Sequence, residues 1–198
     1  MAENVLKHTV RGIADFAANA VNAVDEKSIE KLLESIMCAS RIFIYGAGRS
    51  GLAARAFAMR LVHLDLQTFV IGETITPATH PEDLFICISG SGETSSVIDY
   101  AKSAKKAGVK IVAVTSYPES SLGKIADLIV VIKGKTKLDI SKEDYQKRQI
   151  EGHSVTLAPM GTLFEDTAMI FFDGVIAELM QRLGRDETHM MKKHTSVE

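Results

Sequence analysis

The chain has 198 residues, of which 46% are hydrophobic and 24% are charged, and these values fit one folded domain and exclude a disordered protein. The 23 basic residues nearly match the 25 acidic ones, for a formal net charge of −2, so the basic excess typical of a nucleic-acid binder is lacking. No apolar run approaches the ~18 residues of a membrane helix, and the first residues do not resemble a signal peptide. We therefore expect a cytoplasmic domain that binds neither nucleic acid nor a membrane.

The first 132 residues predict an α/β fold. Apolar residues at helical spacing indicate amphipathic helices over residues 1–24 and from Lys27 to Met37. Short, nearly continuous apolar runs then follow, as is typical of strands buried on both faces of a parallel sheet. These runs are Arg41–Tyr45, Gln67–Ile71, Leu84–Ile88, Lys110–Thr115 and Leu128–Ile132, with helical patterns between them at Leu52–Leu64, Ser95–Ala107 and Ser121–Ala126. Strands alternating with helices predict a doubly wound, five-stranded parallel sheet flanked by helices.

The rest of the chain differs in composition. Residues 133–148 form a polar segment of mixed charge. We interpret this segment as an exposed loop rather than a linker between domains, because only one long helix follows it. That helix, Thr162–Leu183, is so apolar that we expect the sheet, another subunit or both to cover it. The predicted single domain thus has N-terminal helices (1–38), an α/β core (41–132), a loop (133–158), a C-terminal helix (162–183) and a tail (184–198).

Two glycine-rich segments, residues 45–50 (YGAGRS) and 89–94 (SGSGET), resemble each other. Each follows a predicted strand, opens a helix, and places a charged residue and a hydroxyl after two glycines. At the carboxyl ends of adjacent strands, such turns offer free backbone N–H groups, hydroxyls and helix N-termini to an anion, most naturally a phosphate. The alternative is that the glycines only form tight turns and the hydroxyls only cap helices. Two loops in matching positions favour the anion site.

The first loop also matches the dinucleotide-binding pattern G-x-G-x-x-G over residues 46–51. Glu73 lies about 20 residues farther on, where an acid can bind a ribose. However, Arg49 and Ser50 suit a terminal phosphate, and a pyrophosphate on the first loop would leave the second loop without a ligand. The sequence contains no P-loop motif, no nucleophile elbow and no metal-ligand spacing, so we expect no metal.

Chemistry on a sugar phosphate requires a proton carrier, and Glu165 and His63 are the candidates. Glu165 lies at the start of the apolar helix, where a partly desolvated carboxylate suits a general base, but Thr162-x-x-Glu165 also fits a capping box. His63 lies near the end of the helix that starts at the first loop, where a helix-end cation or a core histidine is the simpler interpretation. Glu93 lies either beside a bound sugar or merely at a helix start.

Several stretches resemble the SIS (sugar isomerase) domain superfamily and, within it, the 6-phospho-3-hexuloisomerases. Residues 89–94 resemble the superfamily's S-x-S-G-x-T phosphate loop. The other matching stretches are residues 46–51 (GAGRSG), 56–61 (AFAMRL) with His63, 70–77 (VIGETITP) and 159–165 (PMGTLFE). The resemblance covers essentially the whole chain. The family tends to end in RHANLE, where residues 193–198 here read KHTSVE.

The resemblance implies a flavodoxin-like strand order and an isomerase that interconverts D-arabino-hex-3-ulose 6-phosphate and D-fructose 6-phosphate through a cis-enediol(ate), without a cofactor. It implies Glu165 as the base and His63 as the acid or ring-opening group, in its own or a neighbouring subunit's site. It also implies a homo-oligomer, often a tetramer, and 3-hexulose-6-phosphate synthase as metabolic partner. The implied substrate-binding residues are Gly48, Arg49, Ser50, Ser89, Gly90, Ser91, Gly92, Glu93 and Thr94.

Three alternatives stay open from the sequence. One is a sugar-phosphate sensor without catalysis, which keeps both loops and needs no base. The second is an isomerase of another phosphosugar, because the loops do not specify the sugar. The third is a dinucleotide-binding protein.

Overall fold

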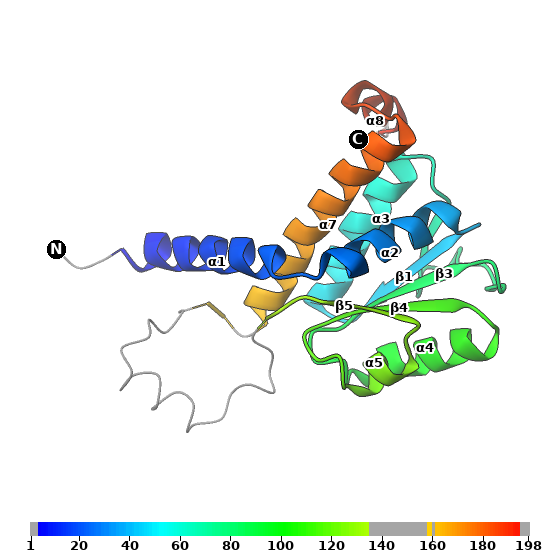
Figure 1. Ribbon diagram of the computed structural model, residues 1–198, viewed down its shortest axis with the longest axis horizontal. Helices are drawn as coiled ribbons and strands as arrows, with labels where there is room; N and C mark the ends of the chain where they lie inside the picture. The colour runs from blue at the N-terminus through cyan, green and yellow to red at the C-terminus, as the bar shows by residue number, and fades with distance from the viewer. Residues whose placement is uncertain (1–3, 135–157, 160, 195–198) are drawn as a thin grey trace.

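The computed structural model describes residues 4–134, 158–159 and 161–194 (Figure 1). Every predicted helix and strand is present. In chain order the elements are α1 (Val5–Asn22), α2 (Glu26–Cys38), β1 (Ile42–Gly46), α3 (Arg49–His63), β2 (Thr68–Val70), β3 (Leu84–Ile88), α4 (Ser95–Lys106), β4 (Lys110–Thr115), α5 (Ser121–Ile125), β5 (Leu128–Val131), α7 (Thr162–Leu183) and α8 (Glu187–Lys193). The predicted loop 133–158 lies, apart from its two ends, outside the described residues.

The five strands form one parallel sheet in the order β2-β1-β3-β4-β5. This order confirms the predicted doubly wound fold and its flavodoxin-like arrangement. The prediction that all five strands are buried on both faces is wrong for β2, whose residues are all half-buried, and for alternate residues of β5. Both strands lie at an edge of the sheet, where only one neighbouring strand covers them.

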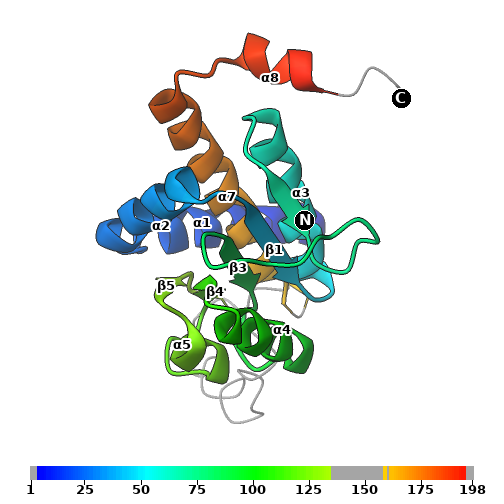
Figure 2. The same cartoon turned by 90° about the vertical axis from the view of Figure 1, so that its right-hand side faces the viewer.

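Helices cover both faces of the sheet (Figures 1 and 2). Because successive residues of a strand point to opposite faces, Ile42 and Ile44 pack with α2, α3 and α7 on one face. Phe43 and Cys87 pack with α4 and α5 on the other face. Burial raises the pKa of the Cys87 thiol well above its usual value, which agrees with the core position that its apolar surroundings in the sequence indicate.

An ion pair joins the beginnings of β1 and β3, the two strands that lead into the glycine-rich loops. Arg41 donates from Nε and Nη2 to the two carboxylate oxygens of Asp83 at 2.9 and 2.7 Å. The His80 backbone N–H donates to the same carboxylate at 2.6 Å. Burial raises the pKa of Asp83, but the hydrogen bonds from Arg41 and His80 outweigh it and hold this pKa below its usual value. The pair thus fixes the two strands side by side at the edge opposite the loops.

Replacing Asp83 with Asn is expected to lower the free energy of unfolding by about 2 kcal/mol at pH 7, since the buried Asp83 carboxylate and its charge-assisted hydrogen bonds are lost. The folded-state pKa of Asp83 is lowered, so its stabilisation is full above the unfolded value of about 4 and is lost as pH falls through the folded value. Urea denaturation of both proteins at pH 7 and in acid measures this.

Glu73→Gln, which alters an exposed ion pair with Arg55, is the control and should change the unfolding free energy by less than about 1 kcal/mol. A difference between wild type and Asp83→Asn that stays constant into acid would contradict the role given to the carboxylate.

Candidate active site

The two glycine-rich loops leave neighbouring strands at the same edge of the sheet. β1 and β3 pair in parallel, with Gly46 opposite Ile88, so both loops begin at the same level. The strand order reverses at this point, because β1 is followed along the chain by β2 on one side and β3 by β4 on the other. Open α/β sheets bind their ligands at such a position. The structure therefore brings the two predicted loops together.

The first loop turns directly into α3, three residues earlier than the predicted start at Leu52. Gly48 adopts φ 60° just before the helix, a conformation that favours glycine. A Cβ on Gly51 would lie 2.6 Å from the Gly46 carbonyl oxygen, so the close approach of these two residues also requires glycine. Ser50 is buried within the first turn and is not the N-cap. The first backbone N–H groups of α3 have no acceptor within the helix and are available to an anion.

The second loop is held by its own hydroxyls. The Ser89 and Thr94 hydroxyl oxygens lie 3.0 Å apart, and Ser89 Oγ also accepts from the Gly92 N–H at 3.2 Å. Ser91 Oγ accepts from the Glu93 N–H at 3.2 Å. Thr94 is the N-cap residue of α4, but its side chain makes no capping hydrogen bond. The alternative that the hydroxyls only cap helices is therefore wrong for Thr94 and for Ser50.

Glu93 connects this loop to α5. Its Oε1 accepts from the Ser121 N–H at 2.8 Å, and the backbone and side-chain hydrogen bonds from Ser121 lower the pKa of Glu93. This hydrogen bond joins the second loop to the first residue of α5 through the charged carboxylate. A contact of Glu93 with a bound sugar stays a prediction.

The start of α7 places Glu165 beside the first loop. Gly161, with φ 86°, is the N-cap residue, and no side chain caps the helix, so the capping-box interpretation is wrong because Thr162 already lies inside the helix. The Glu165 carboxylate instead lies over Gly161 and accepts from Arg49 Nε at 2.6 Å. Arg49 also donates from Nη2 to Asp166 at 2.8 Å. The hydrogen bond to Glu165 raises the pKa of Arg49, so this guanidinium stays charged.

The same turn of α7 packs against the second loop. A Cβ on Gly90 would lie 2.8 Å from the ring of Phe164, so only glycine permits this approach. Phe164 and Glu165 thus contact one loop each. The Glu165 side chain is 19% exposed, so it is mostly buried and yet accessible from a cleft of about 280 Å³. This cleft is lined by Arg49, Leu52, Ala53, Glu165, Asp166, Met169 and Ile170.

His63 does not join this cleft in its own chain. It is fourteen residues beyond Arg49 in α3, a separation of about 21 Å along the helix axis at 1.5 Å per residue. Its side chain is buried, and its Nδ1 has no hydrogen-bond partner within the described parts of the chain. Burial and then the charges of His194 and Arg60 lower the pKa of His63. The interpretation of His63 as a helix-end cation is therefore not supported.

A second cleft, of about 400 Å³, lies at this end of α3. Its lining residues are Arg60, His63, Glu187, Met190, Met191 and His194. The rings of His63 and His194 are 5.4 Å apart. α8, which forms one wall, lies in the segment that the sequence predicted as a tail. Asp65, just beyond α3, contacts α8 through a hydrogen bond with His189 at 2.8 Å and an ion pair with Lys193 at 2.7 Å. It also pairs with Arg185, just before α8, at 3.4 Å.

The model of the SIS domain family matches residues 35–138, which is just over half of the chain. The chain belongs to the SIS domain family. The SIS match begins in α2 and ends beyond β5, so it includes the sheet and both loops. Glu165 and α7 lie outside the matched segment.

Several proteins that align with this SIS domain over nearly its whole chain are named 3-hexulose-6-phosphate isomerase. The Bacillus subtilis protein is 41% identical over 91% of this chain and 92% of its own length. The Methanocaldococcus jannaschii protein is 40% identical over 87% of this chain and 85% of its own. A solved Methanococcus jannaschii structure, from which the same function was inferred, covers 93% of this chain and 98% of its own, with 38% identity and a TM-score of 0.76.

Two further findings concern ligands and membranes. Among the described residues, no group of three or more His, Cys, Asp or Glu side chains is arranged to hold a metal ion. None of the described helices combines the length and the apolar character needed to cross a bilayer. Glu73, the alternative ribose-binding acid, pairs with Arg55 at 3.1 Å on the surface.

Replacing Gly90 with Ala is expected to displace Phe164 and, with it, Glu165. Overpacking of this kind costs about 1–3 kcal/mol, measurable by urea denaturation, and should speed amide hydrogen exchange in the first turn of α7. The double variant Gly90→Ala/Phe164→Leu, with a smaller side chain opposite, should recover part of the loss. Wild-type stability and exchange in Gly90→Ala would contradict the contact.

Proposed function

We propose that this SIS domain is a 3-hexulose-6-phosphate isomerase, which interconverts D-arabino-hex-3-ulose 6-phosphate and D-fructose 6-phosphate. The observation that carries the proposal is the position of Glu165, a mostly buried carboxylate beside two loops suited to phosphate. The relatives of the same name at 34–41% identity support it.

The reaction moves a carbonyl group by one carbon and needs a base rather than a redox cofactor. Glu165 removes the proton from C2, whose acidity the neighbouring C3 ketone increases. The electron pair forms a cis-enediolate across C2 and C3. A proton then adds at C3, while the C2 hydroxyl loses its proton to become the new ketone and the C3 oxygen gains a proton to become the new hydroxyl. Protons are exchanged, and no atom is gained or lost from the sugar.

The phosphate group anchors the substrate at the second loop. Hydroxyls of Ser89, Ser91 and Thr94 and backbone N–H groups of residues 89–94 bind it in this proposal, with Ser50 from the first loop. Binding energy from this remote group can position C2 and C3 against the carboxylate. Arg49, whose side chain is 54% exposed, turns from Glu165 to a substrate oxygen and thereby leaves the carboxylate basic.

His63 belongs to a neighbouring subunit's site in this proposal. The separation of about 21 Å within one chain is far too long for both groups to act on one sugar. A buried imidazole whose pKa is lowered and whose Nδ1 has no hydrogen-bond partner among the described residues can exchange a proton with an enediolate oxygen or open the sugar ring. The homo-oligomer, its tetrameric state, the synthase as metabolic partner and the cytoplasmic location stay predictions from the sequence.

Proton NMR of fructose 6-phosphate in heavy water with the protein tests the proposed reaction. We expect deuterium at C3 of fructose 6-phosphate and signals of a 3-ulose. Deuterium at C1 would instead identify an aldose–ketose isomerase. Binding without any exchange would identify a sensor.

Glu165→Gln is expected to lower kcat by about 10³-fold, because a general base contributes about 10²–10⁴, while KM changes little. Asp166→Asn is the matched control, since it alters the other carboxylate that binds Arg49, and should retain at least a tenth of wild-type turnover. Steady-state kinetics distinguishes them. Equal losses in the two variants would show that Glu165 acts only by holding Arg49.

Mixing inactive subunits tests the origin of the imidazole. His63→Asn and Glu165→Gln proteins, each inactive, are co-refolded. Hetero-oligomers then contain sites with both groups intact, and random pairing about a two-fold axis restores about a quarter of wild-type activity. A mixture that stays inactive, although mass spectrometry shows mixed oligomers, would contradict a shared site.

A further inference from the structure

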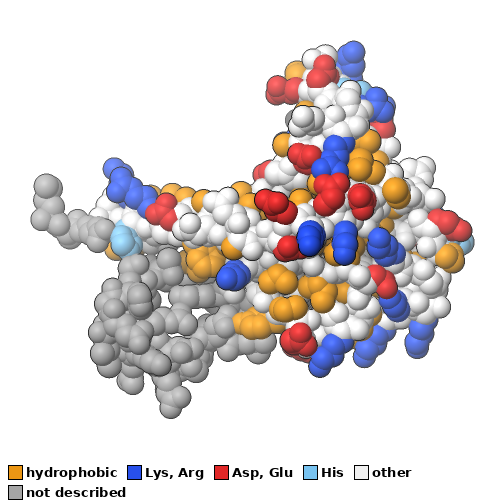
Figure 3. All heavy atoms as spheres, viewed as in Figure 1, with side chains coloured by type: hydrophobic (Ala, Val, Ile, Leu, Met, Phe, Trp, Pro, Cys, Tyr) orange, Lys and Arg blue, Asp and Glu red, His pale blue; other side chains and the backbone are white. Residues whose placement is uncertain are grey.

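The N-terminal half of α1 projects from the body of the molecule (Figure 1). Ala17 and Ala20, in its second half, are buried, whereas Leu6 and Val10 are 69% and 56% exposed. Leu6, Val10 and Ile13 follow one another at intervals of four and three residues and therefore share one face of the helix. Hydrophobic side chains are visible along this helix in Figure 3. An apolar helix face held away from its own core is suited to another surface.

A groove of about 480 Å³ lies between α2 and α7. The apolar side chains of its wall come from both helices, and α1 contributes Val21 at one end. The lining residues are Val21, Glu26, Ile29, Glu30, Leu33, Ile170, Phe171, Gly174, Val175, Glu178 and Arg182. Its volume and its apolar wall suit the side chains of one helix.

Gly174 gives an independent indication of close approach. It lies in the middle of α7, where glycine costs about 1 kcal/mol relative to alanine. A Cβ at this position would meet no atom of the described residues within 4 Å, so no contact within this part of the chain requires glycine. A glycine in a helix interior usually has a packing or functional reason. The groove wall at Gly174 lets the backbone of another helix come close.

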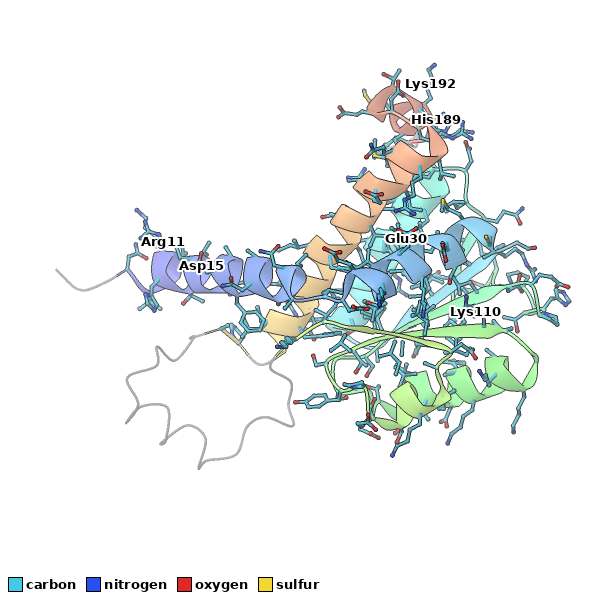
Figure 4. The ribbon with its side chains drawn as sticks, in the orientation of Figure 1. Arg11, Asp15, Glu30, Lys110, His189 and Lys192 are labelled. Atoms are coloured by element: carbon cyan, nitrogen blue, oxygen red, sulfur yellow. The ribbon has the colours of Figure 1, made fainter. Side chains whose placement is uncertain are left out.

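The charges of the two surfaces are complementary. From residue 5 to residue 14, α1 carries Lys7, His8 and Arg11 and no acidic residue; Arg11 lies on the projecting part in Figure 4. The groove carries Glu26, Glu30 and Glu178 against one arginine, Arg182, which bonds to Glu30 and Glu178. The excess of negative charge favours a basic helix and disfavours an acidic one.

We propose that the N-terminal half of α1 docks in the α2–α7 groove of a second copy of this chain. A two-fold arrangement lets each copy give one helix and receive another, so that both apolar surfaces are covered in one closed dimer. Ile170 lines both this groove and the cleft of Glu165, so the docked helix also borders the catalytic cleft. The docking itself does not depend on which reaction the cleft performs.

Sedimentation equilibrium over a range of concentrations tests the docking. We expect wild-type protein to self-associate, and Val10→Asp and Gly174→Leu each to raise the dissociation constant at least tenfold. Gly174→Leu has space within its own chain and should fold, as circular dichroism can verify. Ile75→Asp, which alters an 84% exposed apolar side chain elsewhere, is the control and should associate like wild type.

Cysteine cross-linking identifies the occupant. In a Cys38→Ser background, Val10→Cys protein mixed with Gly174→Cys protein should give a disulfide-linked pair on mild oxidation, whereas Ile75→Cys mixed with Gly174→Cys should not. Three results would each overturn the proposal. The first is a monomeric wild type, and the second is a Val10→Asp or Gly174→Leu variant that associates as strongly as wild type. The third is a missing cross-link although Gly174→Leu weakens association. No readout involves activity, so its failure and that of the proposed reaction are distinguishable.

Discussion

The candidate site depends on the close contact between Phe164 and Gly90. Because the ring occupies the space that a Cβ would fill, the first turn of α7 lies directly on the second loop. Gly134 has a similar role, since a Cβ there would lie 2.5 Å from Cβ of Phe164. This packing fixes the next residue, Glu165, against Arg49 at the start of α3. A carboxylate from the last third of the chain thereby reaches a sheet edge built by its first half.

The two loops differ in how they are kept in shape. The first is absorbed into α3, so that its polar groups have helical geometry and its arginine neutralises the carboxylate until a ligand competes. The second is fixed by hydrogen bonds among Ser89, Thr94 and Gly92, with Glu93 bonded to α5 from behind. Loops organised before binding lose little entropy when they take up an anion.

Local patterns in the sequence predicted most of the fold. Five apolar runs and two glycine-rich turns each carry their own signal, and the strand order came with the family resemblance. The capping box was wrong because Gly161, in the left-handed conformation, is the N-cap residue, so that the helix already includes Thr162. The spacing of Thr162 and Glu165 does not reveal this. α8 was missed because it is short and buries only Met190 in the core, too few apolar positions to give a helical pattern in the sequence. By contrast, the distance between His63 and Arg49 could have been calculated from the rise of the predicted helix alone.

The most direct test of the whole account is a crystal structure with fructose 6-phosphate bound. We expect the phosphate against the hydroxyls and backbone N–H groups of residues 89–94. C2 and C3 of the sugar should lie about 3–3.5 Å from a carboxylate oxygen of Glu165, as reacting atoms do in a near-attack geometry. A sugar phosphate bound elsewhere, or with Glu165 still paired to Arg49 and out of reach of C2 and C3, would contradict it.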